Sequence, residues 1–244
     1  SGLGTGALFD LQQVEVFKGP QSSAFGANAL AGLINVQSAE ASSTAERTFR
    51  LGMGGDGLLR MEGVLNQPIN DRLALRASFQ SARSNGFREN VFLDAEDSNK
   101  RLEESLRLKM RYVAPSGLLL KGALFRVDAD NGYDMWAPDN NEELFTYTNQ
   151  PGDDHQTTTA ASIRAEKLFT NSLSVISVST YSQTDLDYSY DGDWGNDSYW
   201  LGEPYLFNPD AEGYSYDFFD RTKRERTSWS QELRLESGVA LLGV

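Results

Sequence analysis

The run 105–113 reads Ser-Leu-Arg-Leu-Lys-Met-Arg-Tyr-Val. Leu106, Leu108, Met110 and Tyr112 fall on one face of an extended chain, and the mostly basic residues between them fall on the other. This alternation predicts a β-strand with one apolar and one polar face.

The same period of two recurs along most of the chain from about residue 47. Similar runs lie at about 49–53, 58–66, 72–81, 118–128, 157–169, 172–187 and 228–236. The alternation breaks locally at 118–120 and 175–176. We count about eight strands, several of them near the roughly 9–11 residues that a tilted strand needs to cross a bilayer. The sequence therefore predicts an all-β, antiparallel fold.

The connections between these runs alternate between short and long. Short ones lie at 67–71, 114–117 and 170–172, and long ones at about 84–103, 129–156 and 188–226. Only 54–57 is short where the alternation predicts a long loop. Short turns at one end and long loops at the other are typical of an outer-membrane β-barrel. The alternative of a soluble β-sandwich also stays open, because a sandwich would bury the same apolar face against a second sheet.

Composition excludes several classes of protein. The chain has 35 acidic and 22 basic residues, a net charge of −13, which argues against a nucleic-acid partner. It has no cysteine, so it forms neither disulfides nor thiolate metal sites. The sequence holds no run of 18 apolar residues that would form a transmembrane helix. A mean hydropathy of −0.47 is compatible with a barrel, whose strands place apolar residues only at alternate positions.

Residues 1–45 differ from the rest, being rich in Gly, Ala and Ser and poor in alternation. Val14–Phe17 is predicted to be a short buried strand, ended by a turn at Gly19-Pro20. Small residues follow, and Leu33–Val36 is predicted to be a second short strand. Taken alone, this segment indicates a small β-α-β unit.

Three motifs in this segment occur in a characteristic order: Val-Glu-Val-Phe-Lys-Gly-Pro-Gln-Ser (14–22), Phe-Gly (25–26) and Asn-Ala-Leu-Ala-Gly-Leu-Ile-Asn-Val (28–36). Together they resemble the end of the plug domain of TonB-dependent outer-membrane receptors. Three later runs look like early barrel strands of the same family: Gly63–Ile69, Asp71–Arg76 and Ser230–Leu235.

The resemblance implies that 1–45 is the C-terminal part of a small α/β plug and that 46–244 is the first part of the transmembrane barrel. It implies an outer-membrane receptor of a Gram-negative cell that actively imports a scarce solute, such as an iron-siderophore complex, cobalamin or an oligosaccharide. Its partners would be lipid, the solute, and TonB with its inner-membrane energising complex. Such a receptor is not an enzyme and needs no cofactor. Two other classes stay open: a passive porin-type channel, and a soluble all-β carbohydrate-binding module.

The resemblance also implies that the chain is a fragment. A signal peptide, the TonB box and the first part of the plug would precede residue 1. A fold of about 22 strands would need about fourteen more after residue 238.

Three motifs that suggest other chemistry have plainer interpretations. Gly52–Gly57 fits a dinucleotide fingerprint, but a strand-like run follows where a helix is required, so we expect a hairpin turn. His155, the single histidine, is expected in a solvated loop. The acidic run 191–197 suggests calcium but misses the EF-hand spacing, so calcium would need another loop geometry.

The segment 188–220 combines eight acidic residues and eleven aromatic residues with no Lys or Arg. Aromatic side chains in the middle of a loop either pack together or meet a ligand. The acidity favours a neutral or cationic ligand, or a sugar that stacks on the rings. The candidate ligand-binding residues are Trp194, Tyr199, Trp200, Tyr205, Tyr214 and Tyr216.

The polar faces of the strands carry many charges, which are expected to line a wet lumen and hold the plug. They are Arg50, Arg60, Glu62, Arg76, Arg107, Lys109, Arg111, Arg164, Glu166, Glu232 and Arg234. As candidate contacts between plug and barrel we name Glu15 and Lys18 on the plug, with Glu232 and Arg234 on the wall. Lys18 with Glu232 is the pair that a double-mutant cycle would test. No metal ligands or catalytic residues are predicted.

Overall fold

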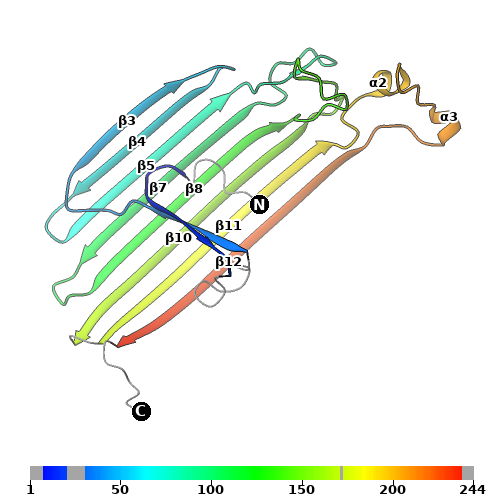
Figure 1. The fold of residues 1–244 in the computed structure, drawn as a ribbon. Coiled ribbons are helices and arrows are strands. Elements are labelled where there is room, and N and C mark those ends of the chain that lie inside the picture. Colours follow the sequence, from blue (N-terminus) through cyan, green and yellow to red (C-terminus); the bar gives the residue numbers. More distant parts are fainter. Residues whose placement is uncertain (1–7, 21–30, 171–172, 238–244) are drawn as a thin grey trace.

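The computed structural model describes residues 8–20, 31–170 and 173–237. Eight strands form one antiparallel sheet, which we call the wall, in the order β12-β11-β10-β8-β7-β5-β4-β3 (Figure 1). They are β3 (Glu46–Met53), β4 (Leu59–Pro68), β5 (Leu73–Ser84), β7 (Arg101–Val113), β8 (Leu119–Tyr133), β10 (Gly152–Thr170), β11 (Leu173–Asp191) and β12 (Phe219–Ser237). The prediction of about eight antiparallel strands is confirmed.

The long connections lie at one end of the wall and the short turns at the other, except for the short turn between β3 and β4, which lies at the end of the long connections (Figure 1). The long connections carry the short parallel pair β6 (Glu89–Asn90) and β9 (Phe145–Thr146) and the helices α2 (Asp197–Leu201) and α3 (Pro209–Glu212). The predicted turn at 170–172 lies largely outside the described residues. No helix in the described part is long and apolar enough to cross a membrane.

The run Gly52–Gly57 forms a hairpin turn, as predicted, and β4 follows it where a nucleotide fold would have a helix. Asp56 and Gly57 have φ angles of 53° and 65°, a conformation that glycine adopts at low cost. The Gly54 N–H donates to the Leu58 carbonyl over 3.0 Å.

Several strands are longer than predicted at their outer ends. β8 continues to Tyr133, β10 begins at Gly152 and β12 begins at Phe219, so the expected loops at 129–156 and 188–226 are too long. His155 accordingly lies in β10 rather than in a loop, with its Nδ1 4.0 Å from Asp130 Oδ1. Both faces of these extensions are polar, so apolar alternation does not mark them, whereas backbone pairing with neighbouring strands holds them.

The two faces of the wall differ in chemistry. Strand register places one transverse row on the outward face: Leu65, Ala77, Leu108, Leu124, Ala161, Tyr181 and Trp229. Most large apolar side chains of this face are exposed, including Leu108 (40%), Leu124 (56%) and Trp229 (71%). Nearer the long loops, the same face bears a row that is polar on β5 to β12, made of Ser81, Glu104, Asp128, Thr157, Asp185 and Glu225, and apolar on β4 and β3, at Met61 and Leu51. On β5 to β12 an apolar band thus ends at a polar border, and the strands continue beyond it.

The distribution of buried residues is the reverse of that in a soluble domain. In the described ranges, fifteen polar or charged residues are buried but only seven hydrophobic ones. Contiguous exposed apolar surface on this scale marks contact with a membrane or a partner. The exposed band therefore favours a wall in lipid over a sandwich closed by a second sheet.

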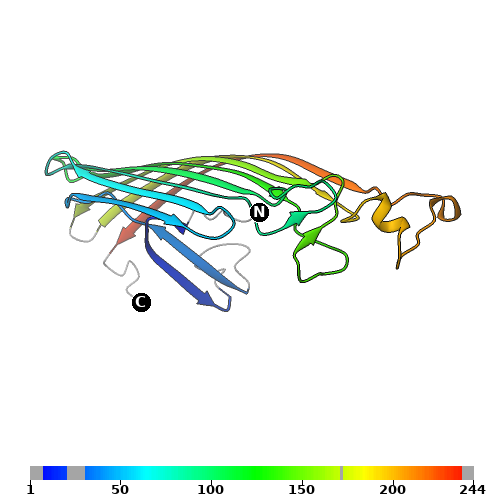
Figure 2. The ribbon, with the colours of Figure 1, turned by 90° about the horizontal axis from the view of Figure 1, so that it is seen from above.

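A separate hairpin lies on one side of the curved wall (Figure 2). It consists of β1 (Leu11–Lys18) paired antiparallel with β2 (Gly32–Ser38). We call it the plug hairpin after the expectation, which stays a prediction, that residues 1–45 belong to a plug. Gly19 ends β1 with a φ of 85°, as the predicted turn requires. The prediction that Val14–Phe17 is buried is wrong for the valines, since Val14 and Val16 are 50% and 64% exposed. The hairpin reaches the wall through polar residues near its open end, where Leu11 pairs with Ser38, and no described segment covers these apolar side chains. Residues 21–30, with the Phe25-Gly26 step, lie outside the described part.

Candidate functional site: the hairpin contact and the outer aromatic loop

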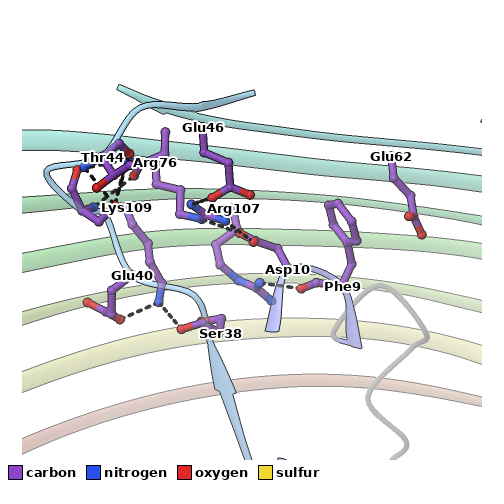
Figure 3. A network of polar contacts seen from close by, with 12 residues as sticks. Phe9, Asp10, Ser38, Glu40, Thr44, Glu46, Glu62, Arg76, Arg107 and Lys109 are labelled. Atoms are coloured by element: carbon purple, nitrogen blue, oxygen red, sulfur yellow. Dashed lines mark hydrogen bonds and ion pairs between the residues drawn. The ribbon is translucent and has the colours of Figure 1, made fainter. Parts of the chain in front are cut away.

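An ion-pair cluster joins the start of the plug hairpin to the wall (Figure 3). Arg76 of β5 donates from Nε and Nη2 to the two carboxylate oxygens of Asp10 over 2.9 and 2.6 Å. Its Nη1 donates to Glu46 Oε2 over 2.9 Å. The side chains of Arg76 and Asp10 are only 7% and 5% exposed. Bidentate geometry with little water makes this the strong form of an Arg–carboxylate pair.

Burial alone raises the pKa of the Asp10 carboxyl, but the hydrogen bonds and charge of Arg76 outweigh it and leave the pKa below its usual value. Because the folded pKa is lowered, the contact is stable above the usual value and weakens as acid protonates Asp10. At neutral pH the pair is fully charged.

A second cluster holds the same open end of the hairpin from its other strand, just after β2, since Ser38 pairs with Leu11 (Figure 3). Lys109 Nζ of β7 donates to the Ser38 carbonyl over 3.1 Å and to Glu40 Oε1 over 2.7 Å. Lys121 of β8 lies 3.4 Å from Glu40 Oε2. The pKa of Glu40 is lowered, because its bonds to the two lysines outweigh the effect of burial. Both strands of the hairpin are therefore fixed by charge at its open end.

The four residues that the sequence analysis named as contacts between plug and barrel take no part in these two clusters. Glu15 accepts from Asn35 within the hairpin over 2.8 Å, and Lys18 is exposed at the end of β1. Glu232 forms an ion pair with Arg234 along β12. Coupling between Lys18 and Glu232 stays a prediction.

The sequence pointed to the wall side of these clusters but missed the plug side. Strand register puts all eleven predicted inward charges on the face that the hairpin contacts. Asp10 and Glu40 were missed because they lie just outside the two plug strands. Their one available signal was the position of an acidic residue at each end of the predicted hairpin.

At the outer end of the wall, the connection 192–218 folds into a cluster of aromatic rings. Five of the six candidate ligand-binding residues belong to it, and Trp194 does not. Trp200 stacks on Tyr216 at 4.9 Å between ring centroids, and Tyr199 stacks on Tyr147 of the neighbouring loop at 4.5 Å. The cluster comprises Tyr147, Tyr199, Trp200, Tyr205, Phe207, Tyr214, Tyr216 and Phe218.

The rings pack together, yet the cluster keeps an accessible surface. Tyr205 and Tyr214 remain 40% and 49% exposed. Trp194 lies apart and stacks on Trp136 of the preceding long loop, with centroids 6.1 Å apart. The loop therefore has rings that pack against one another and, at the same time, exposed ring faces that a ligand could contact.

The acidic residues at the base of this loop organise its backbone. Asp193 Oδ1 accepts from the Gly195 N–H over 3.0 Å and from the Trp200 indole over 3.1 Å. Asp191 Oδ1 accepts the N–H groups of Asp193 and Trp194 over 3.1 Å each. Among the described residues, no three His, Cys, Asp or Glu side chains are grouped to hold a metal ion. The carboxylates of Asp191 and Asp193 therefore accept backbone N–H groups of tight turns.

We expect the outer loop to be more stable at pH 5 than at pH 7. Burial, together with the charge of Asp193, raises the pKa of Asp191 to about 6. The folded pKa is raised, so this contribution to stability is present at low pH and lost as the pH rises through about 6. Proteolysis of the loop in the full receptor should accelerate over that interval. Asp191→Asn should remove the dependence while Asp210→Asn, in exposed α3, should leave it; an unchanged pH profile in Asp191→Asn would refute the assignment.

A buried network of hydrogen-bonded polar side chains, which we call the knot, joins two of the long loops, 85–100 and 134–151. Asn90 Nδ2 donates to Asp134 Oδ2 over 2.9 Å and to Thr148 Oγ1 over 2.8 Å. Thr146 Oγ1 donates to the same Asp134 oxygen over 2.7 Å. Asn90 and Thr146 are fully buried, and Asp134 is 1% exposed.

We expect Asn90→Ala to separate these loops. The change leaves the Asp134 carboxylate without its amide donor, which costs about 1–3 kcal/mol. Amide hydrogen exchange in 85–100 and 134–151 should rise together, whereas Glu142→Ala, at an exposed position of the second loop, should change exchange little. Equal exchange in both variants would show that the knot does not hold the loops.

Comparisons with known proteins agree on the architecture. No protein-family model matches the chain. The vitamin B12 transporter BtuB of Vibrio vulnificus (strain YJ016) is 26% identical over 110 residues, which cover 45% of this chain and 18% of the transporter.

Solved structures match over most of the chain. The siderophore receptor PiuA from Acinetobacter baumannii has a TM-score of 0.74 at 14% identity, over 96% of this chain and 33% of its own. The ferric-catecholate import receptor Fiu from E. coli K12, in its open form, has a TM-score of 0.68 at 18% identity. This match covers 94% of this chain and 36% of the receptor chain. These likenesses show the fold, which is that of the barrel wall of TonB-dependent receptors, and the family resemblance read from the sequence is confirmed. The chain spans about a third of the length of these receptors.

Proposed function

We propose that this chain is part of a TonB-dependent outer-membrane receptor that imports a scarce solute into the periplasm. In this proposal, 1–45 is the end of the plug and 46–244 is the first part of the barrel. The observation that carries it is the two-sided wall, with an exposed apolar band outside and buried ion pairs to the plug hairpin inside. The transporter and receptors that the chain resembles support uptake rather than catalysis.

The two competing functions fit these observations less well. A passive porin-type channel has no need of a hairpin fixed inside its lumen by a buried Arg76–Asp10 pair. A soluble carbohydrate-binding module would not expose a row such as Leu108, Leu124 and Trp229 to water.

Energised uptake by the complete receptor tests the proposal. Cells that express the full gene are compared with cells that lack it, using radiolabelled cobalamin and a ferric catecholate as probes, with and without TonB. We expect the protein in the outer-membrane fraction and saturable uptake that requires TonB. Recovery in the soluble fraction, or uptake that persists without TonB, would contradict the proposal.

We further propose that the aromatic cluster contributes to solute capture, and that the solute face it meets is neutral, cationic or a sugar. The double variant Tyr205→Ala/Tyr214→Ala removes the two most accessible tyrosines of the cluster. Loss of ring contacts should weaken binding of the imported solute about tenfold, since aromatic anchors dominate such contacts. Equilibrium binding to the purified receptor measures this, with Trp229→Ala on the outward face as control. Equal affinity in all three proteins would remove the loop from the binding site.

A further inference from the structure

Among the described residues, the polar contacts that hold the plug hairpin come from one side of the wall. The hydrogen bonds and ion pairs described above come from β5, β7 and β8, through Arg76, Lys109 and Lys121. Arg107 of β7 adds a bond from Nη1 to the Phe9 carbonyl over 3.0 Å. Asn66 of β4 donates to the Thr44 carbonyl over 2.6 Å and fixes the connection into β3. These contacts are made by β4, β5, β7 and β8. Figure 3 shows those of Arg76, Arg107 and Lys109.

The inward charges of β10 and β12 are paired in another way. Arg164 Nη2 lies 2.9 Å from Glu166 Oε2 on its own strand. Arg234 pairs with Glu232 and lies 3.8 Å from Glu236, again on its own strand. These charges are already satisfied, so moving the hairpin away from them breaks none of these ion pairs.

A cavity of about 480 Å³ lies at the boundary between the two sides. Ser38 and Glu40 line it from the end of the plug hairpin. Ser162, Arg164, Val178 and Glu232 are among the residues that line it from β10, β11 and β12. The lining is polar and carries paired charges of both signs, which suits passage of a hydrated polar solute.

The two sides differ in how strongly they resist a pull on the hairpin. Separating Arg76 from Asp10 breaks two charge-assisted hydrogen bonds of a bidentate pair, the strong form of this contact. Ion pairs within β10 and β12 are unaffected by the same movement. A pull on the plug should therefore widen the cavity beside β10–β12 before it breaks the ties to β5, β7 and β8.

We propose that the solute passes the plug hairpin along the inner face of β10–β12, through this cavity, while β5, β7 and β8 keep hold of the hairpin. This inference rests on the proposed transport function. It assigns the route to a particular part of the wall, with Ser162, Val178 and Glu232 as its lining.

Site-directed bridges in the full receptor test the route. The described sequence has no cysteine, so introduced pairs within it are unambiguous. The first pair is Ser38→Cys with Ser162→Cys, which spans the cavity. The matched pair is Asp10→Cys with Arg76→Cys, across an existing contact of 2.6 Å on the held side, at residues that do not line the cavity. Each is closed with a short bis-maleimide, and uptake is compared with that of its own unbridged form.

We expect the 38–162 bridge to abolish TonB-dependent uptake and the 10–76 bridge to leave most of it. Val178→Trp, which fills the cavity from the wall without a bridge, should slow uptake severalfold without changing solute affinity at the outer loops. Equal uptake with and without the 38–162 bridge, or equal block by both bridges, would overturn the route. Absence of TonB-dependent uptake in the unmodified receptor would instead refute the proposed function.

Discussion

Replacing Arg76 with alanine should loosen the plug hairpin by about 3 kcal/mol, because it leaves the buried Asp10 carboxylate without its partner. The two side chains share two hydrogen bonds, and both are almost fully buried. In the full receptor, hydrogen exchange of the β1 and β2 amides should accelerate about a hundredfold, which is what 3 kcal/mol means for an opening equilibrium.

A matched exposed pair separates burial from charge. Arg50 lies 3.6 Å from Glu62, but its side chain is 67% exposed. Surface pairs of this kind contribute about 0–1 kcal/mol, so Arg50→Ala should change exchange by less than fivefold. Adding Asp10→Asn to Arg76→Ala should recover part of the loss. If Arg76→Ala left exchange unchanged, the ion pair would not be what holds the hairpin.

Placing an arginine at Leu108 should block assembly of the barrel in the membrane. Leu108 lies in the outward apolar row, and a charge near the middle of the bilayer destabilises a barrel by about 2–4 kcal/mol. Folding yield into lipid vesicles, read from heat-modifiable migration on gels, measures the effect.

Glu104→Arg is the control on the same strand and the same face. Glu104 belongs to the polar row beyond the band, opposite Ser81 and Asp128, so arginine there should meet water and headgroups. We expect near-normal folding of this variant. Equal folding of both variants would mean that the outward face does not lie in lipid.

The sequence predicted the wall because the two faces of each strand have different surroundings, and the alternation of apolar and polar residues follows that difference. Leu106, Leu108 and Met110 face out while Arg107 and Lys109 face the hairpin, as the run 105–113 indicated. Chain order also gave strand order, since each hairpin connects neighbours in the sheet.

The sequence could not predict the outer ends of the strands or the partners of the inward charges. Beyond the apolar band both faces of β10 and β11 meet water, so Thr157 and Asp185 carry no periodic signal, and only pairing with neighbouring strands reveals them. Asp10 meets Arg76 across 66 positions of the chain, a contact that depends on where the hairpin docks. The aromatic loop was recognisable by composition, but its division into a ring cluster and a separate Trp194–Trp136 stack depends on two loops meeting.

Fluorescence of Trp229 tests most directly whether this sheet is a wall between lipid and a polar lumen. Its side chain is 71% exposed in the outward row. In the full receptor reconstituted with brominated lipids, Trp229 should be strongly quenched and shielded from aqueous iodide, and Trp229→Phe should remove that quenched component. Quenching by iodide with no response to brominated lipid would contradict the account.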